Sequence, residues 1–235
     1  MKKSKGLPKS YRKKIIKLRR KHHHPLLHHI HKKHRISYKT LTYMKEYGPR
    51  SHVYHVIIKE SIKILILASI LSSIGGFGLQ NMQGKLIAIL PLLILLPALN
   101  DMIGDYGAIV SSKFTTMLYL GKIKGSPWKS ESVHRLFFTI FSIAIISSIY
   151  IGIFSSVLAF SGGFPIDFWL FVKVAGVSVA STLILVGIIF LLSVLVGSYV
   201  FKRNEDPNNF LIPIATSVGD LGSMAIFSLL IILLF

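Results

Sequence analysis

Residues 212–235 read IPIATSVGDLGSMAIFSLLIILLF, and this stretch decides the fold. It is long enough to cross a bilayer as a helix, for which about twenty apolar residues suffice. Asp220 lies in its middle. A carboxylate at that depth is energetically expensive and usually marks a path for ions or protons. Helical spacing puts a proline and three hydroxyl residues on the same side as Asp220, namely Pro213, Thr216, Ser217 and Ser223.

A second apolar stretch, residues 85–118, carries two further acids. Asp101 and Asp105 are four residues apart and therefore share one helix face, shortly after Pro91 and Pro97. Each interior proline is expected to free the carbonyl four residues earlier. A small and polar stripe is predicted on this helix, made of Ala98, Asp101, Asp105, Ala108 and Ser112, with Asn100 on the adjoining stripe. The alternative is that the two acids cap or pair locally, for example with Lys113.

The composition separates a basic segment from an apolar one. Of 235 residues, 51% are hydrophobic, yet the formal net charge is +19. The mean hydropathy is +0.59. Most basic residues precede Lys63, so we predict a basic, His-rich cytoplasmic arm over residues 1–55 and a transmembrane domain over residues 56–235. Cysteine is absent, which excludes thiolate metal sites and disulfides.

The predicted fold is all-α, a polytopic membrane protein with five transmembrane helices. Asp206 and Pro207 have the pattern of an N-cap followed by the first helical residue, so Asp206 is interpreted as structural. The predicted spans cover residues 57–78, 85–118, 133–160, 166–200 and 208–235.

Lysine and arginine in the short connections predict the orientation. The arm, the connection at 121–132 and the connection near Val200 are basic, whereas the two other connections are not. We therefore expect a multi-pass protein of the cell (plasma) membrane with its N-terminus in the cytoplasm and Phe235 outside.

Two separated motifs, one in residues 97–121 and one in residues 206–220, resemble the MgtE/SLC41 family of magnesium transporters. The run from Pro97 to Asp105, PALNDMIGD, continues through Ser112-Lys113-Phe114 to Gly121 and is similar to the second transmembrane helix of that family. The run DPNN at 206–209, followed by Ile212-Pro213 and then TSVGD at 216–220, is similar to its final helix. The resemblance covers the chain from about residue 57 onward.

This resemblance implies a homodimer whose pore lies at or near the subunit interface. The role of main pore ligand falls on Asp220, which with its copy would hold a partly hydrated Mg²⁺ as the transported ion. Thr216, Ser217, Asn100 and Asp105 would line the wall or contact the ion's hydration shell, and Asp101 is a further candidate residue of the metal site. Asp105 stands where the family has asparagine, which adds charge near the path. The N and CBS domains of MgtE have no counterpart in this single five-helix unit, so their gating is not carried over.

The arm is rich in histidine among lysine and arginine. We expect it to bind anionic lipid headgroups, because neighbouring positive charges oppose a metal ion. Capture of zinc, nickel or copper is the alternative, and nucleic acid is not the expected partner. The histidines are His22, His23, His24, His28, His29, His31 and His34.

The predicted function is therefore divalent-cation transport, with Mg²⁺ as the expected ion. Two alternatives stay open: transport or exchange of Co²⁺, Ni²⁺, Zn²⁺ or Mn²⁺, and a non-transporting anchor whose arm binds lipid or nucleic acid. An enzyme is not expected, because the sequence has no glycine-rich phosphate loop, HExxH pair or nucleophile elbow.

Overall fold

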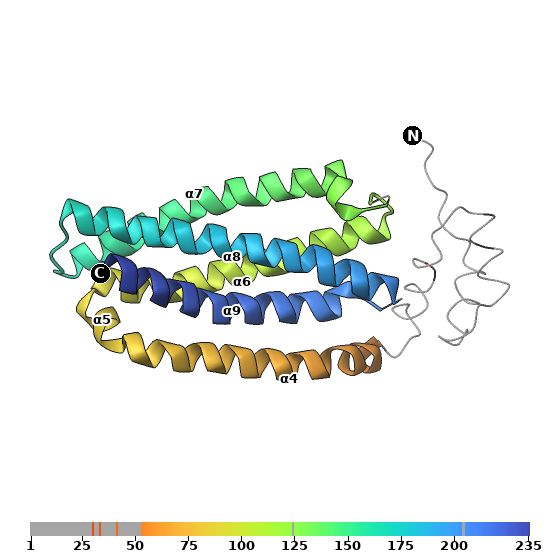
Figure 1. The fold of residues 1–235 in the computed structure, drawn as a ribbon, viewed down its shortest axis with the longest axis horizontal. Coiled ribbons are helices and arrows are strands. Elements are labelled where there is room, and N and C mark those ends of the chain that lie inside the picture. Colours follow the sequence, from red (N-terminus) through yellow and green to blue (C-terminus); the bar gives the residue numbers. More distant parts are fainter. Residues whose placement is uncertain (1–29, 31–32, 34–40, 42–52, 124, 204) are drawn as a thin grey trace.

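The computed structural model describes Ile30, Lys33, Leu41 and residues 53–123, 125–203 and 205–235. Within these residues the secondary structure is helical, and the predicted all-α fold is confirmed (Figure 1). The predicted arm lies almost entirely outside the described residues. The elements are α4 (Val53–Leu79), η1 (Gln80–Met82), α5 (Gln83–Ala88), α6 (Leu90–Tyr119), η2 (Pro127–Lys129), α7 (Glu131–Ser161), α8 (Phe168–Lys202) and α9 (Pro207–Leu234).

Four of the long helices, α6, α7, α8 and α9, are long and apolar enough to cross a membrane. The fifth, α4, has 27 residues and contains the apolar segment Ser61–Phe77. At 1.5 Å per residue, α4 rises about 40 Å, more than a hydrocarbon core of about 30 Å. The five predicted spans therefore match five long helices, and their ends differ from the predicted ones by five residues at most.

The second predicted span was wrong at its start. It is not one helix from residue 85, because α5 ends at Ala88 and Ile89 leaves the helical region with φ −121° and ψ 81°. Pro91 then lies in the first turn of α6, where a missing N–H costs nothing. Pro91 therefore starts a helix instead of kinking one. Pro97 lies inside α6 as predicted.

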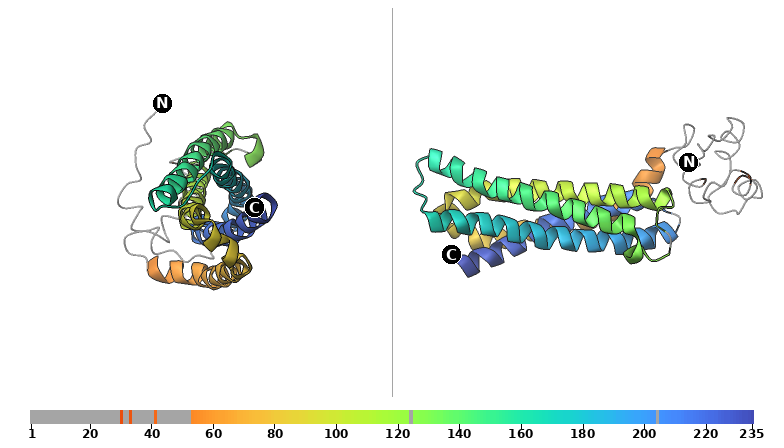
Figure 2. Two further views of the ribbon diagram at one scale, coloured as in Figure 1. Left: turned by 90° about the vertical axis from the view of Figure 1, so that its left-hand side faces the viewer. Right: turned by 90° about the horizontal axis from the view of Figure 1, so that it is seen from above.

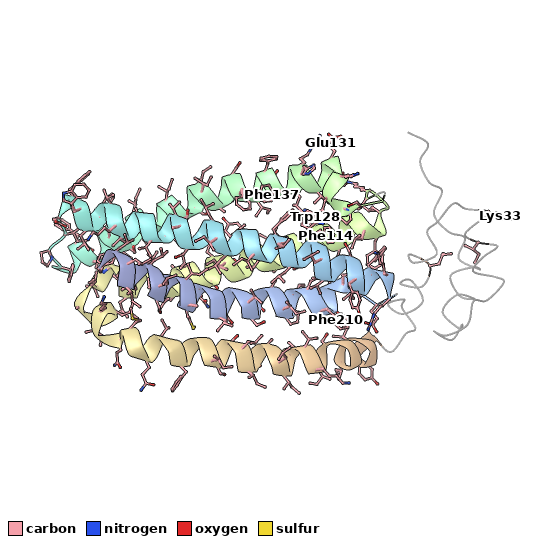
Figure 3. All side chains as sticks on the ribbon, in the orientation of Figure 1. Lys33, Phe114, Trp128, Glu131, Phe137 and Phe210 are labelled. Carbon is pink, nitrogen blue, oxygen red and sulfur yellow. The ribbon has the colours of Figure 1, made fainter. Side chains whose placement is uncertain are left out.

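Two apolar cores run along the bundle. One includes Leu95, Leu99 and Phe227, and the other is built around Phe114 and Phe190. Phe114 is fully buried and comes within 3.0 Å of the position that a Cβ on Gly197 would take, so α6 and α8 pack closely there (Figure 3).

Small residues, among them Ala215, Gly219 and Gly222, bring α9 close to α6 and α8. A Cβ on Gly107 of α6 would lie 3.0 Å from the Ala215 Cβ, and one on Gly219 would lie 3.1 Å from Ile103 Cγ2. A Cβ on Gly222 would lie 2.4 Å from Leu185 Cδ2. The close approach places the middle of α9 directly against α6.

Helix α4 lies at the edge of the bundle, against α9 (Figure 2). Much of its remaining surface is apolar and exposed, including Ile66, Ile70 and Phe77. Such a surface suits contact with lipid. Gly75, which is buried, lies on the side of α4 that faces α9.

The connections fall into two groups at opposite ends of the bundle (Figure 1). The start of α4 lies at the same end as the α6–α7 and α8–α9 connections, which carry Lys122, Lys129 and Arg203. The α7–α8 connection and the end of α9 lie at the other end. At the start of α9, Asp206 is the N-cap and accepts a hydrogen bond from the Asn208 amide at 3.1 Å, as its sequence pattern predicted.

Candidate ion-binding site

The Asp220 carboxylate is held by side chains from two other helices. It lies at the middle of the 28-residue helix α9 and is partly buried. The Ser72 hydroxyl of α4 donates to Asp220 Oδ2 at 2.7 Å. The Asn100 amide Nδ2 of α6 donates to Asp220 Oδ1 at 2.9 Å. Each carboxylate oxygen thus has one neutral donor, and lone pairs on both oxygens stay available for a ligand.

Ser223 fixes the orientation of the Asn100 amide. The Ser223 hydroxyl lies one helical turn beyond Asp220, within hydrogen-bonding distance of Asn100 Oδ1 and 2.9 Å from the Asp220 carbonyl oxygen. Its donation to Asn100 Oδ1 leaves the Asn100 NH₂ group pointing at the Asp220 carboxylate. We call the set Ser72, Asn100, Asp220 and Ser223 the aspartate cluster.

No cationic side chain among the described residues forms an ion pair with Asp220. Arg135 and Glu131 form an ion pair at 2.9 Å, but they lie at the start of α7. Acids inside a membrane usually pair with a basic residue or serve an ion path. The oxygen and amide groups of the aspartate cluster suit hard cations such as Mg²⁺ better than soft ones. The described residues also contain no group of three His, Cys, Asp or Glu side chains able to hold a metal ion within one chain.

Thr216 and Ser217, predicted to line the path, are bonded to their own helix. The Thr216 hydroxyl donates to the carbonyls of Ile212 and Pro213 at 3.0 and 3.1 Å. The Ser217 hydroxyl donates to the Ile214 carbonyl at 3.0 Å, and its side chain is 2% exposed. Neither hydroxyl contacts the Asp220 carboxylate.

Asp101 and Asp105 are exposed on the surface of the single chain. Neither is brought into contact with Asp220, and neither forms an ion pair with Lys113 or another described residue. The α6 residue that reaches Asp220 is Asn100, from the stripe that adjoins the predicted acidic one.

Sequence reasoning missed Ser72. The signal that could have found it is a row of small residues along α4, in which Ser61, Ala68, Ser72 and Gly75 follow each other at spacings of seven, four and three. Such rows mark the side of a membrane helix that packs closely on a neighbour.

A protein-family comparison matches residues 96–230, more than half of the chain, to the MgtE family of divalent cation transporters. The chain therefore belongs to that family of membrane transporters, which are not enzymes. The matched region contains α7, α8 and most of α6 and α9, and with them Asn100 and Asp220. No curated protein and no solved structure gave a significant match.

Proposed function

We propose that this protein transports Mg²⁺ through a pore formed by two copies of the chain at Asp220. The observation that carries the proposal is the Asp220 carboxylate at the middle of α9, held by the neutral donors Ser72 and Asn100. Mg²⁺ is typically bound by one or two carboxylates while it keeps several waters. One Asp220 from each copy would supply such a pair.

The exposed acids of α6 support a second copy. Asp101 and Asp105 lie on central turns of a membrane-spanning helix and face away from their own bundle. A charged residue at the bilayer centre costs about 2.5–3.5 kcal/mol on insertion scales, so lipid is a poor neighbour for them. A second copy facing this surface would enclose them beside a water-filled path. Asp101 and Asp105, together with the partly exposed Asn100 and Thr216, would then line its wall.

The grouping of the connections supports the proposed orientation of the chain in the membrane. With the basic end of the bundle in the cytoplasm, the N-terminal arm is inside and Phe235 is outside, in the cell membrane. An inside-negative potential contributes about 2.3 kcal/mol per charge per 100 mV and drives Mg²⁺ uptake.

The test is Mg²⁺ flux into liposomes that contain the purified protein. We expect Asp220→Asn, which keeps the shape and removes the charge, to reduce flux to that of empty liposomes. Glu131→Gln is the matched control, because it removes one charge from a side chain that is 86% exposed at the start of α7. Native flux in Asp220→Asn would contradict the proposed role of Asp220. The same assay with Co²⁺, Ni²⁺, Zn²⁺ and Mn²⁺ tests the alternative ions.

Cross-linking tests the second copy, and the absence of cysteine makes single-cysteine variants straightforward. Ala98→Cys places a thiol beside the exposed acids of α6. We expect a short bifunctional thiol reagent to join two copies of this variant in membranes. Ile146→Cys is the control, because Ile146 is 71% exposed but belongs to a different helix, α7. Equal cross-linking of both variants, or none at Ala98, would contradict the proposed interface.

A further inference from the structure

Ser72 belongs to α4, a helix that lies outside residues 96–230 and at the edge of the bundle. We propose that Ser72 is a positioning residue for the ion site: its hydroxyl holds the Asp220 carboxylate in the orientation that receives the cation, and Gly75 allows α4 to come close enough for this contact. The inference rests on the proposed function and adds α4 to the ion site.

Gly75 lies one helical turn beyond Ser72, on the same side of α4. A Cβ at Gly75 would lie 3.0 Å from Leu221 Cα and 3.0 Å from Met224 Sδ, with the Asp220 carbonyl oxygen at 3.5 Å. The backbone of α4 therefore touches α9 next to Asp220. A side chain at residue 75 would push the helices apart and lengthen the Ser72–Asp220 hydrogen bond of 2.7 Å.

The neighbouring serines of α4 show that this hydrogen bond is not a general property of serine in the helix. The Ser69 hydroxyl donates to the Leu65 carbonyl at 2.9 Å, and the Ser73 hydroxyl donates to the Ser69 carbonyl at 2.8 Å. Bonding back to the preceding turn is the usual behaviour of a serine within a helix. Ser72 instead donates to a carboxylate 148 residues away in the sequence.

Two donors from two helices fix the carboxylate more firmly than one. Asn100 holds Oδ1 and Ser72 holds Oδ2, so rotation of the carboxylate about its terminal bond breaks both hydrogen bonds. Without Ser72, the carboxylate can turn about its remaining contact with Asn100. The cation must then order the side chain on binding, and that ordering weakens the affinity.

The experiment compares Ser72→Ala with Ser73→Ala in the Mg²⁺ flux assay over a range of Mg²⁺ concentrations. We expect Ser72→Ala to raise the half-saturating concentration about threefold to tenfold, the range expected for ordering one side chain. Ser73→Ala should leave it unchanged, because its hydroxyl bonds only within α4. Ser72→Thr keeps the hydroxyl and should restore the native value. Gly75→Ala should raise the half-saturating concentration by at least as much as Ser72→Ala.

A purely structural Ser72 would give a different result. Ser72→Ala would then lower the amount of folded protein and its thermal stability, while the half-saturating concentration of the folded fraction stayed native. That outcome, or equal behaviour of Ser72→Ala and Ser73→Ala, overturns the positioning role. Asp220→Asn separates the two proposals. Native flux in that variant would contradict the proposed function itself. Lost flux in Asp220→Asn, together with a native half-saturating concentration in Ser72→Ala, would contradict only the role of Ser72.

Discussion

The aspartate cluster and the contact between α7 and α8 are both polar regions within a membrane bundle, but their hydrogen bonds differ. Where α7 packs on α8, buried hydroxyls bond to main-chain carbonyls: Ser178 of α8 donates across the contact to the Ser148 carbonyl at 2.7 Å, and Ser155 and Ser156 each donate within α7 to the Gly152 carbonyl at 3.0 Å. In the aspartate cluster, side chains from three helices bond to one another.

This difference in hydrogen bonding distinguishes a contact that packs helices together from a site that can bind a cation. A serine hydroxyl that donates to a helix carbonyl satisfies its own donor and brings no charge, so it joins helices at little cost. A carboxylate in the same environment carries a large cost that neutral donors reduce only in part. The aspartate cluster thus has the composition of a cation site, whereas the α7–α8 contact has the composition of a helix interface.

Asn100→Ala is the sharpest test of this comparison. It removes the donor to Asp220 Oδ1 and the acceptor of the Ser223 hydroxyl together. We expect Mg²⁺ flux to fall about 10- to 100-fold, the range found when a group that orients a metal ligand is lost. The measurement is the initial rate of Mg²⁺ entry into liposomes per folded protein.

Ser156→Ala is the matched control from the α7–α8 contact, since it also deletes a buried polar group but one bonded to a main-chain carbonyl. Its flux should stay within about twofold of native, because the Ser156 hydroxyl bonds back to the preceding turn of its own helix and not to the aspartate cluster. Equal losses in Asn100→Ala and Ser156→Ala would remove the functional distinction between the two regions.

Gly152→Ala tests the packing role of the α7–α8 contact. A Cβ at Gly152 would lie 2.9 Å from Ala175 Cα and 3.2 Å from Ser178 Cβ, so the two helices must move apart. We expect the free energy of unfolding to fall by about 1–3 kcal/mol, as for other overpacked cores. Thermal unfolding in detergent measures this change. The half-saturating Mg²⁺ concentration of the folded fraction should stay native, and a large shift in it would show that this contact shapes the ion site.

Much of the fold follows from the sequence because each span combines apolar length with clear end signals. Asp206 and Pro207 fixed the start of α9, and the apolar runs located the other long helices within a few residues. The break at Ile89 was missed because a proline signals both kinks and helix starts. Whether Pro91 kinks a helix or starts one depends on the backbone conformation of the residues before it.

Some residues of the candidate site stand out in the sequence, whereas others can be found only from the packing of the helices. Asp220 and Asn100 stood out because a carboxylate and an amide within apolar spans are costly. Ser72 did not, because α4 also contains Ser61, Ser69 and Ser73, and a hydroxyl in a membrane helix is common. Which of these serines reaches Asp220 depends on the side of α4 that packs on α9, and tertiary packing decides that side. The exposure of Asp101 and Asp105 likewise depends on how α6 is turned in the bundle.

Ser178→Ala should have the smallest effect, and it tests whether the α7–α8 contact depends on its hydrogen bonds at all. The variant removes the hydroxyl that donates to the Ser148 carbonyl, whose oxygen still belongs to the helical ladder of α7. Hydrogen bonds between membrane helices average about 0.6 kcal/mol, so the unfolding free energy should fall by about that amount. The loss should be smaller than that of Gly152→Ala, and Mg²⁺ flux should be native. A loss of about 2 kcal/mol or more would exceed the largest values typical of such bonds and would mean that the Ser178 hydroxyl, rather than the close fit around Gly152, holds α7 against α8.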